Sequence, residues 1–422
     1  MKRINVDLVV VGGGPAGMAA AVEAKKLGVK DVLILERDYT LGGVLNQCIH
    51  DGFGLVKFRK RMTGGQYAQK YINLVKECSC SYFLDTMVIE ITADKVVYAV
   101  NKRDGVLEIQ AKAIILAMGC RERSRPQAFL FGTRPAGVYT AGTVQRLINM
   151  EGYLPGSRAV ILGSGDIGMI MARRMTLENI SVEGVYEIMP VPGGLTRNVE
   201  QCLKDYDIPL HLSKTVTEVV GRDRVEGVFV ADVDENRKPL NKTKRFVPCD
   251  MLVLSVGLIP ENELSQKAGI PLDSRTRGPI VDDSMMTEMK GVFAAGNVVS
   301  VFDLVDYVSV TGEIAARGAC EYINNGADGK KQYVSLVSGQ NVSVVLPQKI
   351  FMRPDLPAVD TFIRVKATEE NVGIWTEWDG ARERIGRERI VKPAEMVIAR
   401  ISRRDGSDSK MSVHVEGGGG HG

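Results

Sequence analysis

The chain contains 422 residues, of which 45% are hydrophobic and 25% are charged, and its formal net charge is +3. This composition is typical of a folded globular protein, and the length predicts two or three domains. The small net charge and the lack of basic runs interleaved with aromatic residues argue against binding to nucleic acid or to an anionic membrane.

No apolar stretch approaches the ~18 residues that a membrane span requires. Met1 lies close to the first predicted strand, so we expect no signal peptide. The seven cysteines are irregularly spaced and include no zinc-type Cys-x-x-Cys pair, which is typical of a reducing compartment. We therefore expect a cytoplasmic protein without a metal site.

The first predicted strand–turn–helix unit carries a glycine signature. An apolar strand precedes Gly12-Gly13-Gly14-Pro15-Ala16-Gly17, and Glu36 lies 19 residues beyond Gly17. In such a unit the first glycine permits a tight turn, the second admits a pyrophosphate to the backbone N–H groups, and the third packs helix on strand. The acid binds a ribose. The sequence therefore predicts a dinucleotide at this helix N-terminus.

A β meander is predicted next, from about Met87 to Ile109, because β-branched runs alternate with turn residues. An apolar strand over residues 114–119 closes this part of the chain.

The same order of elements then occurs a second time. The signature is Gly163-Ser164-Gly165-Asp166-Ile167-Gly168, and Glu187 again lies 19 residues beyond the last glycine. A meander over residues 216–246 and a closing strand over residues 250–257 follow. The chain is internally duplicated, and we expect two bound dinucleotides.

Glu187 also predicts which dinucleotide binds at the second unit. A carboxylate hydrogen-bonds the ribose 2′-OH and repels a 2′-phosphate, which favours NAD over NADP. The nearby Arg173 and Arg174 are the side chains that could weaken this preference.

The predicted secondary structure is different in the last third of the chain. A strand with glycine turns is predicted over residues 287–297, and a helix from about Asp306 to Asn324. From about residue 331 the sequence predicts a small β domain with Trp375 and Trp378 in its core. The stretch 405–422, which includes His421, is expected to be a flexible tail.

The chain resembles the two-dinucleotide flavoprotein oxidoreductases, which include thioredoxin reductase and glutathione reductase. The resemblance is carried by the two glycine units, the turns at Gly119 and Gly257, and the run Gly291-Val292-Phe293-Ala294-Ala295-Gly296-Asn297. The resemblance implies an α/β fold with two Rossmann-type domains, FAD at the first unit and NAD(H) at the second. It departs at Asn297, where the family usually has Asp; Asn still hydrogen-bonds a hydroxyl. The implied domains are a split FAD domain (1–122 and 258–328), a linker and NAD(H) domain (123–257), a β domain (329–404) and the tail (405–422).

The resemblance also implies the residues that hold each cofactor. Tyr307 and Val308 would open a helix beneath the isoalloxazine, where the helix N-terminus favours the negative charge of reduced flavin. The implied FAD-binding residues are Gly12, Gly14, Pro15, Ala16, Gly17, Glu36, Arg37, Gly43, Val88, Ala117, Gly119, Gly296, Asn297, Tyr307 and Val308. The implied NAD-binding residues are Gly163, Gly165, Asp166, Ile167, Gly168, Glu187 and Gly257.

The segment from Leu41 to Gly54 is expected to pass the flavin, and it holds the two candidate catalytic residues. The family's dithiol positions are Leu45 and His50 here, and the NAD domain contains only Cys202 and Cys249, so neither known dithiol arrangement is present. Cys48 is either a redox thiolate of the kind found in NADH peroxidases or a small packing residue. His50 is either a proton carrier or a buried structural histidine.

The chain also resembles a narrower subgroup of these flavoproteins. That resemblance is carried by the segment around Cys48, the run Thr63–Tyr67 and the run Arg134–Gln145. The members of this subgroup are the FAD/NAD oxidoreductase subunits that accompany bacterial glycerol-3-phosphate dehydrogenase-like proteins, related to electron-transfer subunits of amino-acid dehydrogenases and sarcosine oxidases. The resemblance implies electron exchange with two partners, a small cysteine-containing redox protein and a second dehydrogenase subunit.

Two other functions stay open from the sequence: a self-contained NADH-dependent peroxide or thiol-disulphide reductase that uses Cys48, and a structural or sensing component that binds dinucleotides without turnover. The β domain is expected either to dock a partner or to form a homo-oligomer.

Overall fold

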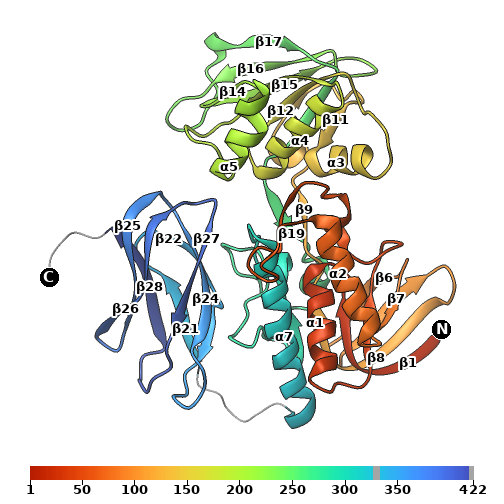
Figure 1. Ribbon diagram of the computed structural model, residues 1–422, viewed down its shortest axis with the longest axis vertical. Coiled ribbons are helices and arrows are strands. Elements are labelled where there is room, and N and C mark those ends of the chain that lie inside the picture. The colour runs from red at the N-terminus through yellow and green to blue at the C-terminus, as the bar shows by residue number, and fades with distance from the viewer. Residues whose placement is uncertain (327–332, 418–422) are drawn as a thin grey trace. The chain divides into compact units, whose positions relative to one another are not determined.

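The computed structural model describes residues 1–326 and 333–417. They form two compact units (Figure 1). The first contains residues 1–46, 51–120 and the described residues from Pro260 onward; the second contains residues 47–50 and 121–259. The chain passes from one unit to the other at the short strands β9 (Cys120–Glu122) and β19 (Leu258–Pro260). The second unit is thus an insertion in the first.

The first unit is built on a sheet whose strands run in the order β5-β2-β1-β8-β7-β6, with β20 also paired to β8. Strands β1, β2, β5, β8 and β20 are parallel neighbours, while β6 and β7 form an antiparallel meander against the first half of β8. The inner strands are continuous apolar runs because both faces are covered. The strands are β1 (Lys2–Val11), β2 (Val32–Leu35), β5 (Ser81–Phe83), β6 (Met87–Ile91), β7 (Val96–Asn101), β8 (Gly105–Leu116) and β20 (Val292–Ala294), with a separate pair β3 (Asp51–Phe53) and β4 (Met62–Thr63).

Three long helices lie beside one another in this unit: α1 (Pro15–Lys26), α2 (Gly64–Glu77) and α7 (Val305–Asn325) (Figure 1). Thr63 begins α2 with a capping box, in which its hydroxyl accepts from the Gln66 backbone N–H and the Gln66 side chain accepts from the Thr63 N–H. The short helix α6 (Glu263–Lys267) completes the set. No helix within residues 1–326 and 333–417 is both long and apolar enough to cross a membrane.

The second unit repeats the arrangement of the first. A parallel sheet runs β11-β18-β12-β13-β14, so that β12, β13 and β18 take the places that β1, β2 and β8 take in the first unit. A four-stranded sheet, β10-β15-β16-β17, contains the second meander. The elements are β10 (Phe131–Gly132), β11 (Val138–Thr140), α3 (Ala141–Asn149), β12 (Arg158–Leu162), α4 (Asp166–Leu177), β13 (Ser181–Tyr186), α5 (Thr196–Asn198), β14 (Leu210–His211), β15 (Lys214–Val220), β16 (Gly227–Asp232), β17 (Arg245–Pro248) and β18 (Met251–Leu254).

The β domain consists of a five-stranded sheet, β23-β21-β28-β25-β26, and a three-stranded sheet, β22-β24-β27. Apolar side chains from both sheets form one core, in which Trp378 is 2% exposed. The prediction that Trp375 also belongs to this core is wrong: Trp375 is only partly buried, and Arg382 and Arg384 lie over its ring. The strands are β21 (Tyr333–Ser338), β22 (Val342–Leu346), β23 (Lys349–Phe351), β24 (Val359–Val365), β25 (Glu369–Trp378), β26 (Ala381–Val391), β27 (Met396–Ile401) and β28 (Lys410–Gly417).

The predicted flexible tail is wrong for residues 405–417. Strand β28 lies in the middle of the five-stranded sheet and buries Met411, Val413 and Val415. The turn before it is fixed by Asp379, whose carboxylate accepts from the backbone N–H groups of Ser407 and Asp408. The remainder of the predicted tail, residues 418–422 with His421, lies outside the described residues.

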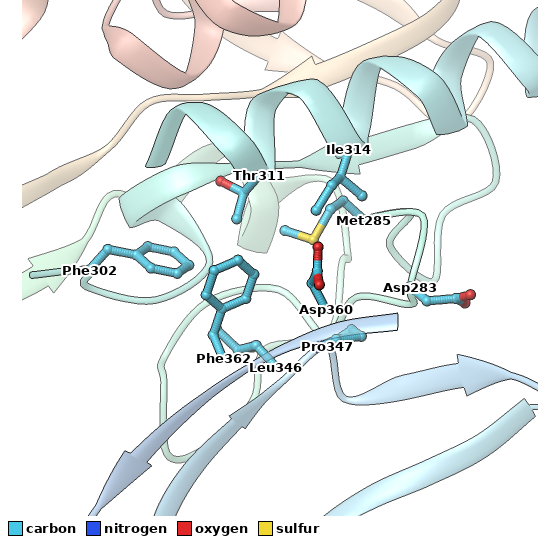
Figure 2. A pocket seen from close by; sticks show the side chains of 9 residues that line it. All are labelled: Asp283, Met285, Phe302, Thr311, Ile314, Leu346, Pro347, Asp360 and Phe362. Carbon is cyan, nitrogen blue, oxygen red and sulfur yellow. The ribbon is translucent and has the colours of Figure 1, made fainter. Parts of the chain in front are cut away.

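Side chains of the β domain also pack against the first unit's α7. Leu346 and Phe362 from the β domain meet Thr311 and Ile314 of α7 around a small, mostly apolar cavity (Figure 2). The Phe362 ring packs edge-on against Phe302, with 5.3 Å between centroids. This contact holds the β domain against the first turns of α7.

Candidate functional site

The first glycine loop has the geometry that a bound pyrophosphate requires. A Cβ at Gly12 would lie 2.4 Å from the Ala117 carbonyl oxygen, and the Gly12 φ of +104° suits only glycine. At Gly14, by contrast, no heavy atom of the described residues other than its two chain neighbours lies within 4 Å of the position that Cβ would occupy. The loop therefore packs tightly on the sheet at Gly12 and is open at Gly14, where α1 begins.

Glu36 connects this loop to the end of the next strand. It is 6% exposed, and its Oε2 accepts a 2.6 Å hydrogen bond from the Gly13 N–H while its Oε1 accepts one of 2.8 Å from the Asp38 N–H. These bonds fix the carboxylate at the edge of the loop, as expected for a group that orients a ribose.

Helix α7 approaches the same loop closely. A Cβ at Gly296 would lie 2.9 Å from Ala16 Cβ and 3.0 Å from Val308 Cγ1, so predicted FAD residues from two distant parts of the chain meet there. A Cβ at Gly312 would lie 2.3 Å from the Ala16 carbonyl oxygen. The Gly296 N–H donates to the Thr311 hydroxyl (2.9 Å), which fixes the turn before α7.

Some of the other predicted FAD residues lie beside the first glycine loop, and others do not. A Cβ at Gly43 would lie 3.2 Å from Gly14 Cα, which places Gly43 beside the open part of the loop. The Asn297 side-chain oxygen Oδ1 accepts from the Phe302 N–H (3.0 Å), so this part of the side chain closes a loop. Tyr307 lies in the first turn of α7, but its ring packs 5.8 Å from Phe362. The Arg37 side chain is 62% exposed.

The remaining predicted FAD residues belong to the sheet and the loop themselves. Val88 lies in β6 and is 5% exposed. The Ala117 N–H donates to the Val11 carbonyl (2.8 Å), and apart from the chain neighbours of Gly119 no described heavy atom lies within 4 Å of the position that a Cβ at Gly119 would occupy. Pro15 is the first residue of α1 and Gly17 packs against the Gly12 carbonyl.

The second glycine loop repeats the contacts of the first. A Cβ at Gly163 would lie 2.1 Å from the Ser255 carbonyl oxygen, and one at Gly168 would lie 2.6 Å from Ser255 Cβ. Glu187 is 7% exposed; its Oε2 accepts from the Ser164 N–H (2.9 Å) and its Oε1 from the Met189 N–H (2.9 Å). The acid therefore binds the loop and the residue two positions after itself in both units.

Another segment lies against the second loop, as Gly42 and Gly43 lie against the first, where the Gly42 N–H donates to the Gly13 carbonyl (2.9 Å). The Gly193 N–H donates to the Ser164 hydroxyl (2.8 Å), and the Leu195 N–H donates to Asp166 Oδ1 (2.8 Å). The sequence did not single out Ser164, Gly193 or Gly194 as site residues. The signal was the turn-rich run Pro190-Val191-Pro192-Gly193-Gly194 directly after the strand that ends near Glu187.

The two arginines that could weaken a preference for NAD make contacts with other side chains. Arg173 donates to the Tyr206 hydroxyl (3.1 Å), and Arg174 forms an ion pair with Glu178 at 2.5 Å. The closing strand β18 is shorter than predicted and ends at Leu254, so Gly257 lies three residues beyond it; the Gly257 carbonyl accepts from the Arg123 N–H (3.0 Å). Ile167 lies in the first turn of α4.

Residues 47–50, which carry both candidate catalytic side chains, group with the second unit. Cys48 Sγ lies 4.0 Å from Gln145 Oε1, and the Asn149 amide donates to the Gln47 carbonyl (2.8 Å). Burial raises the pKa of the Cys48 thiol to about 12, opposite to the low pKa that a redox thiolate needs. The role of His50 as a proton carrier stays a prediction.

Comparison with known proteins agrees with the presence of two dinucleotide-binding units. A family model described as pyridine nucleotide-disulphide oxidoreductase matches residues 6–315. The chain is 28% identical over 288 residues to the hydrogen cyanide synthase subunit HcnB of Pseudomonas protegens, covering 63% of this chain and 60% of that protein. It is 25% identical over 334 residues to an opine oxidase subunit of Agrobacterium tumefaciens, covering 74% and 65%. The chain thus spans under two thirds of the length of these relatives.

Among solved structures, the thioredoxin reductase of T. acidophilum superposes with a TM-score of 0.61 at 25% identity, covering 75% of this chain and 98% of that one. The predicted α/β fold with two dinucleotide-binding domains is confirmed.

Proposed function

The chain belongs to the pyridine nucleotide-disulphide oxidoreductase family, an FAD- and NAD(P)H-dependent family of enzymes, and from that premise we propose a specific reaction for it. It exchanges a hydride between NAD(H) and FAD and passes electrons to or from a partner dehydrogenase component. The observation that carries the proposal is one hydrogen bond that occurs in both units. The Glu36 carboxylate accepts it from the Gly13 N–H, and the Glu187 carboxylate accepts it from the Ser164 N–H.

The residues of the first unit fit FAD. The backbone N–H groups of the loop at Gly14 and of the first turn of α1 after Pro15 would bind the pyrophosphate, and Glu36 would orient a ribose. FAD and the nicotinamide supply the hydride chemistry when bound. The N-terminus of α7, next to Gly296 and Val308, would stabilise negative charge on the reduced ring.

The second unit fits NAD(H) better than NADP(H). Glu187 is buried and hydrogen-bonded through both oxygens, so its carboxylate is held in place to repel a 2′-phosphate. Arg173 and Arg174 make other contacts.

Two observations favour a separate electron partner. The sequence contains neither dithiol arrangement of the disulphide reductases, and the buried Cys48 has a raised pKa. Both relatives named above are described as subunits, one of a hydrogen cyanide synthase and one of an opine oxidase. We infer that the partner is a dehydrogenase subunit of the glycerol-3-phosphate or amino-acid type, with a small cysteine-containing redox protein as a further component. The same observations count against a self-contained reductase that uses Cys48.

Anaerobic titration of the FAD-loaded chain with NADH and NADPH tests the proposal. NADH is expected to bleach the flavin absorbance at lower concentration than NADPH. Glu187→Gln should reduce that preference about tenfold, the equivalent of ~1.4 kcal/mol. Glu183→Gln, on the strand β13 that leads to Glu187 but paired with Arg158, is the matched control and should leave the preference unchanged. Flavin that stays oxidised with both nucleotides would instead support a protein that binds dinucleotides without turnover.

A further inference from the structure

The hairpin formed by β3 and β4 ends in a tip, residues 55–61, that concentrates positive charge. Four of the five residues from Lys57 to Arg61 are basic, and no other five consecutive residues of the chain include four basic ones. We propose that this hairpin tip is the docking surface for an acidic face of the electron partner. The inference rests on the proposed function, because it describes the partner that the proposed function requires.

Two residues of the hairpin tip attach it to helices of the first unit. The Lys57 N–H donates to Asp306 Oδ1 (3.0 Å), and Lys57 Nζ forms an ion pair with Glu313 at 2.5 Å. The Phe58 ring packs against Tyr67 of α2, with 5.2 Å between centroids. Asp306 and Glu313 belong to α7, the helix whose N-terminus the proposed function places beneath the flavin. A protein docked on the hairpin tip would therefore lie beside this helix.

The backbone of the hairpin tip forms a closed turn. The Phe58 and Lys60 N–H groups both donate to the Gly54 carbonyl, at 3.0 and 3.2 Å. A Cβ at Gly54 would lie 2.3 Å from Met62 Cε, and the Gly54 φ of +80° favours glycine. Because these bonds already order the turn, a partner that binds it pays little for ordering it.

The exposed side chains of the hairpin tip combine apolar and positive surface. Leu55 and Val56 are 47% and 54% exposed. Arg59 and Lys60 are exposed as well, and within the described residues neither is paired with an acid. Neighbouring charges of one sign repel each other in the free protein. A small apolar area bordered by unpaired cations suits a protein partner that supplies the opposite charge.

The same side chains favour a protein over a membrane or a nucleic acid. Phe58 is the only aromatic residue of the hairpin tip, and it packs against the fully buried Tyr67. An anchor on a membrane surface needs a broad apolar face, and single-stranded nucleic acid needs aromatic rings on which its bases stack. Leu55 and Val56 alone provide neither.

Electron transfer to two haem proteins of opposite charge tests the proposal. The probes are cytochrome b5, which is acidic, and cytochrome c, which is basic. The FAD-loaded chain is first reduced with dithionite and freed of the excess, so no nucleotide is needed. Each reduced flavin then gives two electrons, one to each of two haem irons, and releases a proton. Stopped-flow absorbance of the haem measures the rate for each probe.

Arg59→Glu combined with Lys60→Glu should slow the reduction of cytochrome b5 about tenfold at low ionic strength and speed that of cytochrome c, because charge acts on the rate of encounter. At about 0.5 M salt the difference from the unsubstituted chain should disappear, because the charges are then screened.

Lys26→Glu combined with Lys30→Glu is the matched control. It makes the same change in net charge with two exposed residues, at the end of α1 opposite the first glycine loop. It should change either rate less than about twofold, since exposed charges act over little more than a Debye length.

An unchanged cytochrome b5 rate in the hairpin-tip variant, or equal slowing in the two double variants, would overturn the proposal. So would a hairpin-tip variant that keeps its cytochrome b5 rate but no longer sediments with phosphatidylserine vesicles, or that changes its oligomeric state; the surface would then contact a membrane or a second copy of the chain. Failure of NADH to bleach the flavin would remove the proposed function alone, because dithionite supplies the electrons in this test.

Discussion

Arg403 and Asp283 form an ion pair at 2.6 Å in which the two side chains are only 9% and 10% exposed. Arg403 comes from the β domain and Asp283 from the segment that leads to β20. Asp283 also accepts from the Phe351 N–H (3.1 Å), and Arg403 donates to the Pro357 carbonyl (2.7 Å). The pair is an enclosed electrostatic link between the β domain and the rest of the first unit.

Arg403→Met should destabilise the protein strongly. Burial raises the pKa of Asp283 and Arg403 opposes that rise, so removing Arg403 leaves a buried acid without its charged partner. Breaking one side of such a pair costs about 3–5 kcal/mol in the free energy of unfolding. Urea unfolding of the FAD-loaded chain measures this loss. Arg400→Met, which removes an exposed partner of Asp360, is the control and should leave unfolding unchanged. Equal effects of the two variants would contradict the assignment.

Gly312→Ala should weaken FAD binding. The added Cβ would lie 2.3 Å from the Ala16 carbonyl and force α7 away from α1, at a cost of about 1–3 kcal/mol for overpacking. The flavin-to-protein absorbance ratio after gel filtration should fall several-fold. Gly65→Ala in α2 is the matched control, because no described heavy atom beyond its chain neighbours and the nearby backbone of α2 lies within 4 Å of that Cβ position. It should gain up to about 1 kcal/mol of helix stability and retain the flavin.

The second unit should lose stability in mild acid through His211. Burial lowers the pKa of this imidazole below its ordinary value of 6.5, and Arg245 and Lys214 lower it further. Below about pH 6.5 the unfolded chain then binds more protons than the folded chain, so stability is complete above that pH and falls as the pH drops.

His211→Phe tests this assignment, because it removes the titrating group and keeps a ring to stack on Tyr186, where the centroids lie 4.6 Å apart. Between about pH 7 and pH 5, the melting temperature of the unsubstituted chain should fall more steeply than that of the variant. Equal slopes in the two proteins would show that His211 does not carry the effect.

Cys48 should resist alkylation in the folded protein. With a pKa of about 12, only about one thiol in ten thousand is ionised at about pH 8. Mass spectrometry after iodoacetamide treatment should find Cys78, which is partly exposed, modified well before Cys48. Labelling of Cys48 as fast as Cys78 would restore the redox alternative. In that event Cys48→Ser should also abolish NADH-dependent turnover with the natural acceptor.

The dinucleotide loops were predictable because their chemistry is local. Glycine spacing and the distance to Glu36 or Glu187 follow from the length of one helix and one strand. The hydrogen bond from Leu195 to Asp166 was not predictable, because it joins residues about thirty positions apart through a turn with no regular period.

Strand β28 shows a different kind of failure. Met411, Val413 and Val415 alternate with polar residues, which is a strand pattern. The neighbouring glycine-rich run concealed it, and the partners that bury these side chains lie in β21 and β25. The link between Arg403 and Asp283 left no sequence signal at all, since isolated charges in loops are ordinarily solvated.

The position of β28 determines when the β domain can be completed during synthesis. Its pairing with β21 and β25 places the last described strand of the chain between two strands made much earlier. Until the ribosome has released that strand, β21 and β25 each present an open edge that can pair with another chain. A polypeptide cut just before β28 would therefore contain both glycine loops but would expose two unprotected sheet edges. We expect such a polypeptide to be bound by chaperones and degraded by proteases.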